Sequence, residues 1–277
     1  MKGHMINFIF ITNQPDMARF AEHSGVSRIF VDLERLGKYE RQGHLNTFIS
    51  QHSMSDVKQV KRVLCRAELL VRLNPLNPDT PHEIEQAISS GADILMQPMF
   101  RDVSEVAAFS AMINGRVKFI PLIETGAAFD QLEAIVRVKG VSEVYIGLND
   151  LHLDLGLAFM FEPFSNGMLE RAAEIINAAG KPFGVGGIAR VGEGTLPGEM
   201  VLGEHLRLGS SQVILSRTFN RDIDEEGGEL SFAAELGKLR DAQLGLLERS
   251  DLQKADDHRR VCNVINEFIR DKNEKAI

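Results

Sequence analysis

Short apolar runs alternate with amphipathic stretches along most of the 277-residue chain. The runs lie at residues 6–12, 28–34, 68–74, 93–99, 118–124, 143–150, 182–188 and 212–217, and we predict a β-strand at each. The stretches between them space their apolar residues as helices do. Strands alternating with helices predict a closed (β/α)8 barrel of the TIM type. A doubly wound open sheet is the alternative, but no glycine-rich nucleotide motif follows the first run.

The pattern changes after the last predicted strand. The acidic stretch RDIDEEGGEL is followed by two further amphipathic stretches at 231–249 and 251–271, which is more helix than one barrel needs. We therefore predict a barrel domain over residues 1–221 and a helical extension over 222–277. The extension packs either on the barrel or on a neighbouring subunit, and the pattern leaves both open.

Composition narrows the classes of partner. The formal charge of −8 and the scattered basic residues give no reason to expect nucleic acid or an anionic membrane. Only two cysteines occur, Cys65 and Cys262, so no disulfide framework is implied. The first apolar run is too short for a membrane span and lacks a cleavage site. We expect a cytoplasmic protein.

Two acids stand at the ends of consecutive predicted strands. The run KFIPLIE ends on Glu124 and the run EVYIGLND ends on Asp150, and a right-handed crossover brings both ends to the same edge of the sheet. Paired carboxylates suit a hard divalent cation such as Mg2+ or Mn2+. The alternative is that both are ordinary acids at helix N-termini.

Other strand ends carry polar groups as well. Arg72 offers a planar fork of donors for a carboxylate or enolate, or forms a salt bridge to Asp32 or Glu34. Gln97 and Asn149 are candidate substrate contacts. For proton transfer, His44 and His52 in the loop 37–53 are candidates, with surface positions as the alternative. No lysine ends a strand, which disfavours an imine mechanism.

The glycine-rich loop GVGGIARVGEGTLPGE follows the seventh run and includes Gly187. Thr195 and Pro197 are placed as the start of the next helix, where a phosphate or carboxylate could bind. Tight turns alone also explain such glycines. We keep Gly187 as a candidate substrate contact.

At these motifs the chain resembles the HpcH/HpaI aldolase and citrate lyase β-subunit family. The resemblance covers about residues 14–217 and is strongest in GADILMQPMF, PLIET and VSEVYIGLNDLHLDLG. It implies a (β/α)8 fold, oligomers with exchanged C-terminal helices, and reversible aldol or Claisen-type cleavage. It also implies that Glu124 and Asp150 hold Mg2+ or a similar cation and that Arg72 contacts the keto acid or its enolate.

The second run departs from that family. The hydroxy-keto-acid aldolases end this strand in Asp-Gly-Glu-His, whereas VDLER places Arg35 at the histidine position. The citrate-lyase branch is closer, yet its second acid is also replaced by Arg35. The same aldolases carry a glutamine two residues before the metal-binding acid, and Leu122 occupies that position in this chain. These changes keep Glu124 and Asp150, the metal ligands that the resemblance implies, and alter the position of its general base.

We therefore predict a metal-dependent carbon–carbon lyase acting on a keto acid and an aldehyde or thioester. The expected site comprises Glu124 and Asp150 for the metal, Arg72 for the enolate, and Glu34, Arg35 and His44 for proton transfer or orientation. Alternatives are an acyl-CoA thioester lyase, or a barrel that has lost catalysis and serves as a binding or assembly subunit. A homo-oligomer, trimer or hexamer, is expected.

Overall fold

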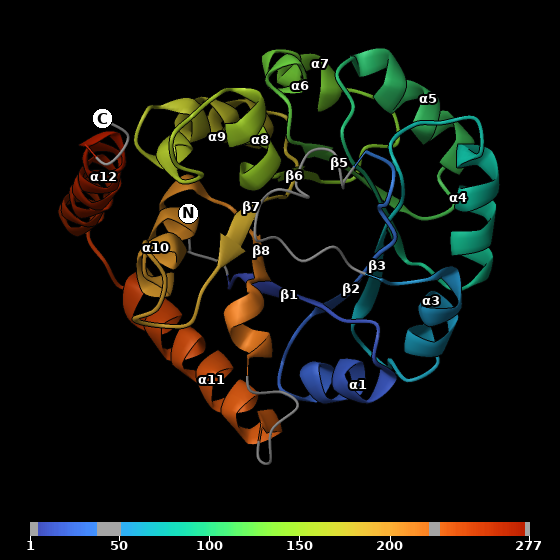
Figure 1. The fold of residues 1–277 in the computed structure, drawn as a ribbon, viewed down its shortest axis with the longest axis horizontal. Helices are drawn as coiled ribbons and strands as arrows, with labels where there is room; N and C mark the ends of the chain where they lie inside the picture. Colours follow the sequence, from blue (N-terminus) through green and yellow to red (C-terminus); the bar gives the residue numbers. More distant parts are fainter. Residues whose placement is uncertain (1–4, 38–50, 222–227, 275–277) are drawn as a thin grey trace. The chain divides into compact units, whose positions relative to one another are not determined.

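The computed structural model describes residues 5–37, 51–221 and 228–274. Within these ranges, parallel strands follow one another in sequence order around a closed barrel (Figure 1). The strands are β1 Asn7–Ile11, β2 Arg28–Asp32, β3 Glu68–Arg72, β4 Ile94–Gln97, β5 Lys118–Ile123, β6 Val144–Ile146, β7 Phe183–Ile188 and β8 Gln212–Leu215. The predicted (β/α)8 barrel is confirmed, and the open sheet is excluded.

Helices connect the strands on the outside of the barrel. They are α1 Pro15–His23, α3 Met54–Lys61, α4 Thr80–Ser89, α5 Val103–Ile113, α6 Gly126–Asp130, α7 Leu132–Ile135, α8 Leu148–Asp154, α9 Met168–Ala178 and α10 Gly198–Leu208, with 3-10 turns η1 Glu162–Phe164 and η2 Arg217–Asn220. Two longer helices follow, α11 Gly228–Leu247 and α12 Asp251–Glu274. No helix in the described ranges is long and apolar enough to cross a membrane.

Two predicted elements differ from the structure. Strand β6 ends at Ile146, because Gly147 caps a helix that begins at Leu148 and buries Leu148 and Leu151. The helical stretch predicted between the runs 118–124 and 143–150 forms two short helices, α6 and α7, separated at Gln131. That side chain donates to the carbonyl oxygens of Arg101 and Ala127 and so fixes the break.

Contacts divide the chain into two compact units, Ile9–Tyr145 and Met1–Phe8 with Ile146–Ile277. In the first unit, charged side chains meet at the N-terminal ends of the strands. Arg28 donates to both carboxylate oxygens of Glu143, at 2.6 and 2.7 Å, and to Glu68 at 3.0 Å. Lys118 donates to the other oxygen of Glu68 at 2.6 Å. This network joins residues up to 115 positions apart in sequence.

Glu22 closes the turn between α3 and β3 in the same unit. Its buried carboxylate accepts hydrogen bonds from the backbone N–H groups of Cys65, Arg66 and Ala67. Burial would raise the pKa of Glu22, but these three donors outweigh it and the pKa lies below its usual range. The charged carboxylate therefore stabilises the folded state.

We expect Glu22→Gln to lower the free energy of unfolding by about 1.5–3 kcal/mol at neutral pH, as for hydrogen bonds to a charged group. Because the folded pKa is depressed, this stabilisation is present above the unfolded pKa and is lost as pH falls through the folded pKa. Urea unfolding of both proteins over an acid series should show their stabilities converge at low pH. Glu133→Gln, at an exposed position, is the control. A pH-independent difference would contradict this assignment.

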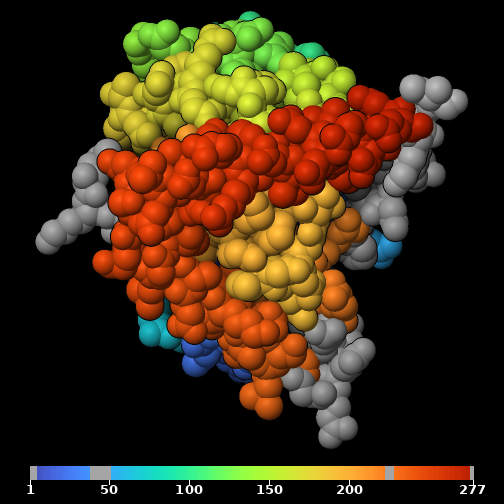
Figure 2. Space-filling view, turned by 90° about the vertical axis from the view of Figure 1, so that its left-hand side faces the viewer, coloured from blue at the N-terminus to red at the C-terminus, as the bar shows by residue number. Residues whose placement is uncertain are grey.

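The second unit contains the C-terminal helices. The Arg249 guanidinium follows α11 and donates to the Gly203 carbonyl of α10 and to Asp257 of α12. A Cβ at position 203 would lie 3.1 Å from Arg249 Nη1, so glycine makes room for this contact. Phe268 of α12 stacks on Phe159 at 4.0 Å. Figure 2 shows α12 in red, lying between the yellow region of α9 and the gold region of α10.

The two predicted C-terminal helices are thus confirmed, and within this chain they pack on α10. Their contact with a neighbouring subunit stays a prediction, as does the trimer or hexamer.

Candidate active site

Arg72 lies at the centre of the charged groups at the C-terminal ends of β2 and β3. Its Nε and Nη2 each donate to one carboxylate oxygen of Asp32, both at 2.8 Å. Asp32 and Arg72 are register partners on adjacent parallel strands, which brings their side chains to the same side of the sheet. The salt-bridge alternative to Asp32 is confirmed. Nη1 makes no hydrogen bond to any described residue.

Two further carboxylates act on the same guanidinium. Glu34 Oε2 lies 3.3 Å from Arg72 Nη2. Burial alone would lower the pKa of Arg72, but the negative charges of Asp32, Glu34 and Glu124 outweigh it and raise that pKa well above its usual range. The Arg72 guanidinium is therefore always positively charged, and its orientation is fixed by these acids.

Glu124 directly follows β5 and is 2% exposed. Its Oε1 accepts the backbone N–H of Met99 at 2.9 Å. Met99 has φ 52°, in the left-handed region that non-glycine residues rarely adopt. This turn of the backbone after β4 aims an amide at the carboxylate. The sequence did not single out Met99, because a side chain of this type carries no signal for a left-handed backbone.

Hydrogen bonds join Asp32 and Arg35, at the end of β2, to His52. Arg35 Nη2 donates to the carbonyl oxygen of His52 at 2.9 Å, and His52 Nδ1 accepts the backbone N–H of Asp32 at 3.0 Å. The imidazole nitrogen that could take a proton is thus occupied by an amide, and we assign the ring proton to Nε2. Both side chains position the end of β2. His44 lies outside the described residues.

The side chain of Gln97 points toward helix α5 and away from the side of the sheet that carries Arg72. Its Nε2 lies 3.5 Å from the carbonyl oxygen of Glu105 in α5, in the outer helical layer. Met96, one residue earlier, is the register partner of Arg72, so alternation along β4 turns Gln97 to the opposite side of the sheet. This geometry does not support the predicted substrate contact, because the side chain faces a helix.

Asn149 and Asp150 lie in the second unit, in the first turn of α8. Asp150 is buried and Asn149 is half-buried. Gly186 in β7 has φ +49°, and a Cβ there would lie 2.8 Å from Leu148 Cδ1. The glycine therefore lets the start of α8 pack on β7. The adjacent Gly187 pairs with Ile214 of β8 beyond a register shift.

The donor types fit a divalent cation of the magnesium kind. Glu124 and Asp150 each offer carboxylate oxygen, and both acids are buried. Hard cations prefer such oxygens to nitrogen or sulfur ligands. Glu124 lies just before α6 and Asp150 lies in the first turn of α8. The alternative interpretation, in which both are acids at helix N-termini, therefore agrees with the positions of their backbones.

The protein is a (β/α)8 barrel with buried charged groups at the C-terminal ends of its strands. Enzymes with this fold carry their active sites at that end of the barrel. The chain belongs to the HpcH/HpaI aldolase/citrate lyase family, whose profile matches residues 8–194. It is therefore a member of a family of lyases. A comparison with curated proteins finds no match.

Solved structures show the same fold. A HpcH/HpaI aldolase/citrate lyase family protein from Burkholderia cenocepacia has a TM-score of 0.62 at 15% identity, covering 82% of this chain and 95% of the other. The citrate synthase SbnG has a TM-score of 0.59 at 16% identity, covering 85% and 95%. The citrate lyase β subunit from M. tuberculosis, complexed with oxaloacetate and magnesium, has a TM-score of 0.59 at 12% identity, covering 86% and 96%.

Proposed function

We propose that this protein is a divalent-metal-dependent carbon–carbon lyase that cleaves or forms an aldol adduct of pyruvate or a related keto acid. The observation that carries this proposal is the Arg72 guanidinium, held by Asp32 and Glu34 at the strand ends of a barrel from a lyase family. A fixed guanidinium whose Nη1 has no hydrogen-bond partner among the described residues suits an oxygen that gains negative charge during carbon–carbon cleavage.

Glu124 and Asp150 would hold the cation, which we propose to be Mg2+ or Mn2+. The resemblance of PLIET and VSEVYIGLNDLHLDLG to the metal-binding motifs of the family supports pairing the two acids. The magnesium in the M. tuberculosis citrate lyase β subunit also supports this choice. A bound cation supplies Lewis-acid polarisation of a keto group.

The chain's own residues supply binding and orientation. Arg72 Nη1 donates to a keto-acid carboxylate or enolate oxygen, while Asp32 keeps the guanidinium in place. Glu34 lies beside the same guanidinium and orients water or the substrate. Asn149 and Gly187 are proposed contacts to the remainder of the substrate. Proton transfer is assigned to Glu34 or to His44, because His52 and Arg35 are engaged with backbone groups.

A second candidate is an acyl-CoA thioester lyase of the citrate lyase β-subunit type. It is favoured by the ending DLE of the second strand run, which resembles the citrate-lyase branch more than the hydroxy-keto-acid aldolases, whereas Arg35 departs from both. A third is a barrel without catalysis that acts as a binding or assembly subunit. A catalytic test separates these candidates.

The test is decarboxylation of oxaloacetate, which needs only a cation and enolate stabilisation. We expect pyruvate release that depends on Mg2+ or Mn2+ and falls at least about 100-fold in Glu124→Gln/Asp150→Asn. The glutamine keeps an oxygen that can accept the Met99 N–H, so the backbone there is preserved. Glu133→Gln removes one exposed charge from α7 and is the control.

The outcomes separate the candidates. Turnover that is independent of both acids would overturn the metal assignment. Metal binding without decarboxylation would favour thioester substrates, which can be screened next. A protein that binds neither cation nor oxaloacetate would favour the non-catalytic subunit.

A further inference from the structure

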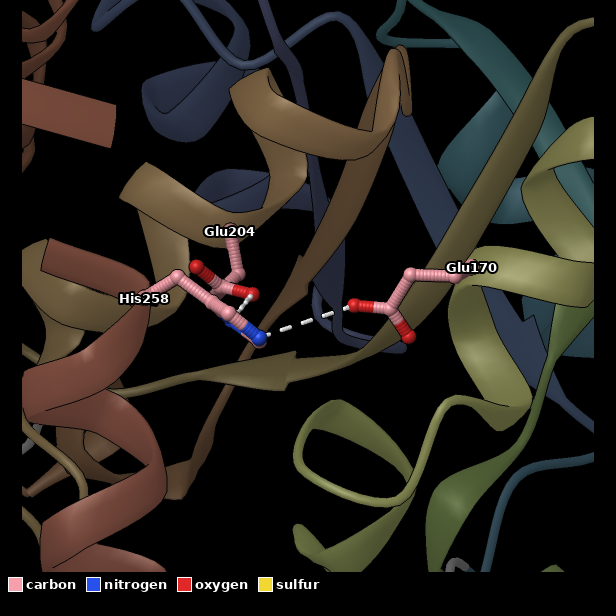
Figure 3. A group of neighbouring side chains, drawn as sticks. All are labelled: Glu170, Glu204 and His258. Atoms are coloured by element: carbon pink, nitrogen blue, oxygen red, sulfur yellow. Dashed lines mark hydrogen bonds and ion pairs between the residues drawn. The ribbon is translucent and has the colours of Figure 1, made fainter. Parts of the chain in front are cut away.

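A second group of ligand-type side chains lies on the outer helices of the second unit. Glu170 of α9, Glu204 of α10 and His258 of α12 bring their ligand atoms within 4.8 Å of one another (Figure 3). Cys262 lies one helical turn after His258, with Sγ 3.6 Å from His258 Nε2. Neither the proposed reaction nor the family comparison uses this group.

The hydrogen bonds of His258 orient its ring toward a ligand position. Nδ1 lies 2.9 Å from Glu204 Oε2, so the ring proton belongs on Nδ1 and Nε2 keeps its lone pair. Nε2 in turn faces Cys262 Sγ at 3.6 Å and Glu170 Oε1 at 3.8 Å. A carboxylate on one ring nitrogen with the other nitrogen available is the usual setting of a metal-bound histidine.

The spacing of the ligand atoms fits a tetrahedral ion. Bonds of about 2.0–2.1 Å to nitrogen and about 2.3 Å to sulfur place those two atoms about 3.5 Å apart. The measured separation is 3.6 Å, and the positions i and i+4 put both side chains on one face of α12. Glu170 Oε1 lies 3.8 Å from the same Nε2, so the Glu170 carboxylate is near enough to the histidine to supply a third ligand.

Arg207 is the competing partner of the two acids. It holds Glu204 through Nε at 3.1 and 3.0 Å and through Nη2 at 2.6 Å, but contacts Glu170 through Nη2 alone. Glu170 Oε2 is buried and accepts no hydrogen bond from any described residue. Glu204 is therefore fixed as the partner of His258, whereas Glu170 has a carboxylate oxygen available for a cation.

We infer that Glu170, His258 and Cys262 bind a borderline-soft divalent cation such as Zn2+, with Glu204 orienting the imidazole. Mixed nitrogen, sulfur and oxygen donors select Zn2+ or Co2+ over Mg2+. The ligands come from α9 and α12, and Glu204 from α10, so the ion fastens α12 to both helices. Its role is structural and independent of the proposed reaction.

The test uses the full chain, freed of metal by a chelator and titrated with Co2+. Cobalt bound by a thiolate gives a charge-transfer absorption band in the near ultraviolet, which reports the sulfur ligand directly. We expect one equivalent to produce this band and Zn2+ to displace it. Cys262→Ser should abolish the band, whereas Cys65→Ser, which removes the exposed thiol, should keep it.

Two further variants complete the design. Glu170→Gln should weaken Co2+ binding about 10-fold or more while the fold persists. The pair Glu124→Gln/Asp150→Asn should leave the band unchanged, so failure of the proposed catalytic site is distinguishable from failure of this one. Added Zn2+ should also slow proteolytic removal of α12 in the wild type and leave Cys262→Ser unaffected. Absence of a thiolate band, or a band that survives Cys262→Ser, overturns the inference.

Discussion

Arg72→Lys is expected to fold and to lose about 100- to 1,000-fold in kcat/KM for oxaloacetate decarboxylation, the range for loss of one oxyanion donor. The lysine keeps the positive charge but has a single nitrogen, whereas the guanidinium uses two nitrogens on Asp32 and presents a third. Steady-state kinetics at saturating Mg2+ measure the loss. Thermal unfolding establishes that the variant is folded.

Arg116→Lys is the matched control for that substitution. Arg116 pairs with Glu85 on the surface, and both side chains are at least one-third exposed, so the same change there should leave kcat/KM unaltered. Arg72→Lys with wild-type kinetics would remove the guanidinium from the mechanism. A fall in both variants would instead indicate a general effect of the substitution on folding.

Arg28→Ala should produce the largest loss of stability, about 3–5 kcal/mol, the range for breaking a buried ion pair. Arg28 and Glu143 side chains are each 8% exposed, and removal of the guanidinium leaves the Glu143 carboxylate buried without its two donors. Urea-induced unfolding measures the change. Activity should be kept under conditions where the variant is folded, because this pair lies at the opposite strand ends from Arg72.

A double variant tests the physical reason. Arg28→Met/Glu143→Leu removes both charges, and replacement of a buried pair by apolar groups is often neutral or stabilising. We expect it to be more stable than Arg28→Ala. If the double variant were the less stable protein, the cost would come from packing rather than from an isolated charge.

Hydrophobic periodicity was sufficient to predict the barrel. Strand positions were predicted within a few residues, because buried parallel strands are continuous apolar runs bounded by polar residues. The prediction was wrong where one run contained two elements. VYIGLND is apolar up to Leu148, and only the extended backbone of Gly147 at the helix N-cap separates β6 from α8.

The candidate site was predicted less completely. Charges at the ends of strands identified Arg72, Asp32 and Glu34, which the structure brings together. The same signal included Gln97, because sequence position alone does not show which side of the sheet a terminal residue faces. The acceptor role of His52 depends on a backbone amide 20 residues away, and no local pattern encodes it.

The contact between Arg35 and the His52 carbonyl affects any attempt to convert this protein into a hydroxy-keto-acid aldolase. Arg35→His would introduce the proton-transfer group of those enzymes but remove the side chain that donates to the His52 carbonyl. His52 would then lose a restraint on the ring that accepts the Asp32 amide. Successful engineering therefore requires a second substitution that restores a donor to the His52 carbonyl before the imported histidine can act.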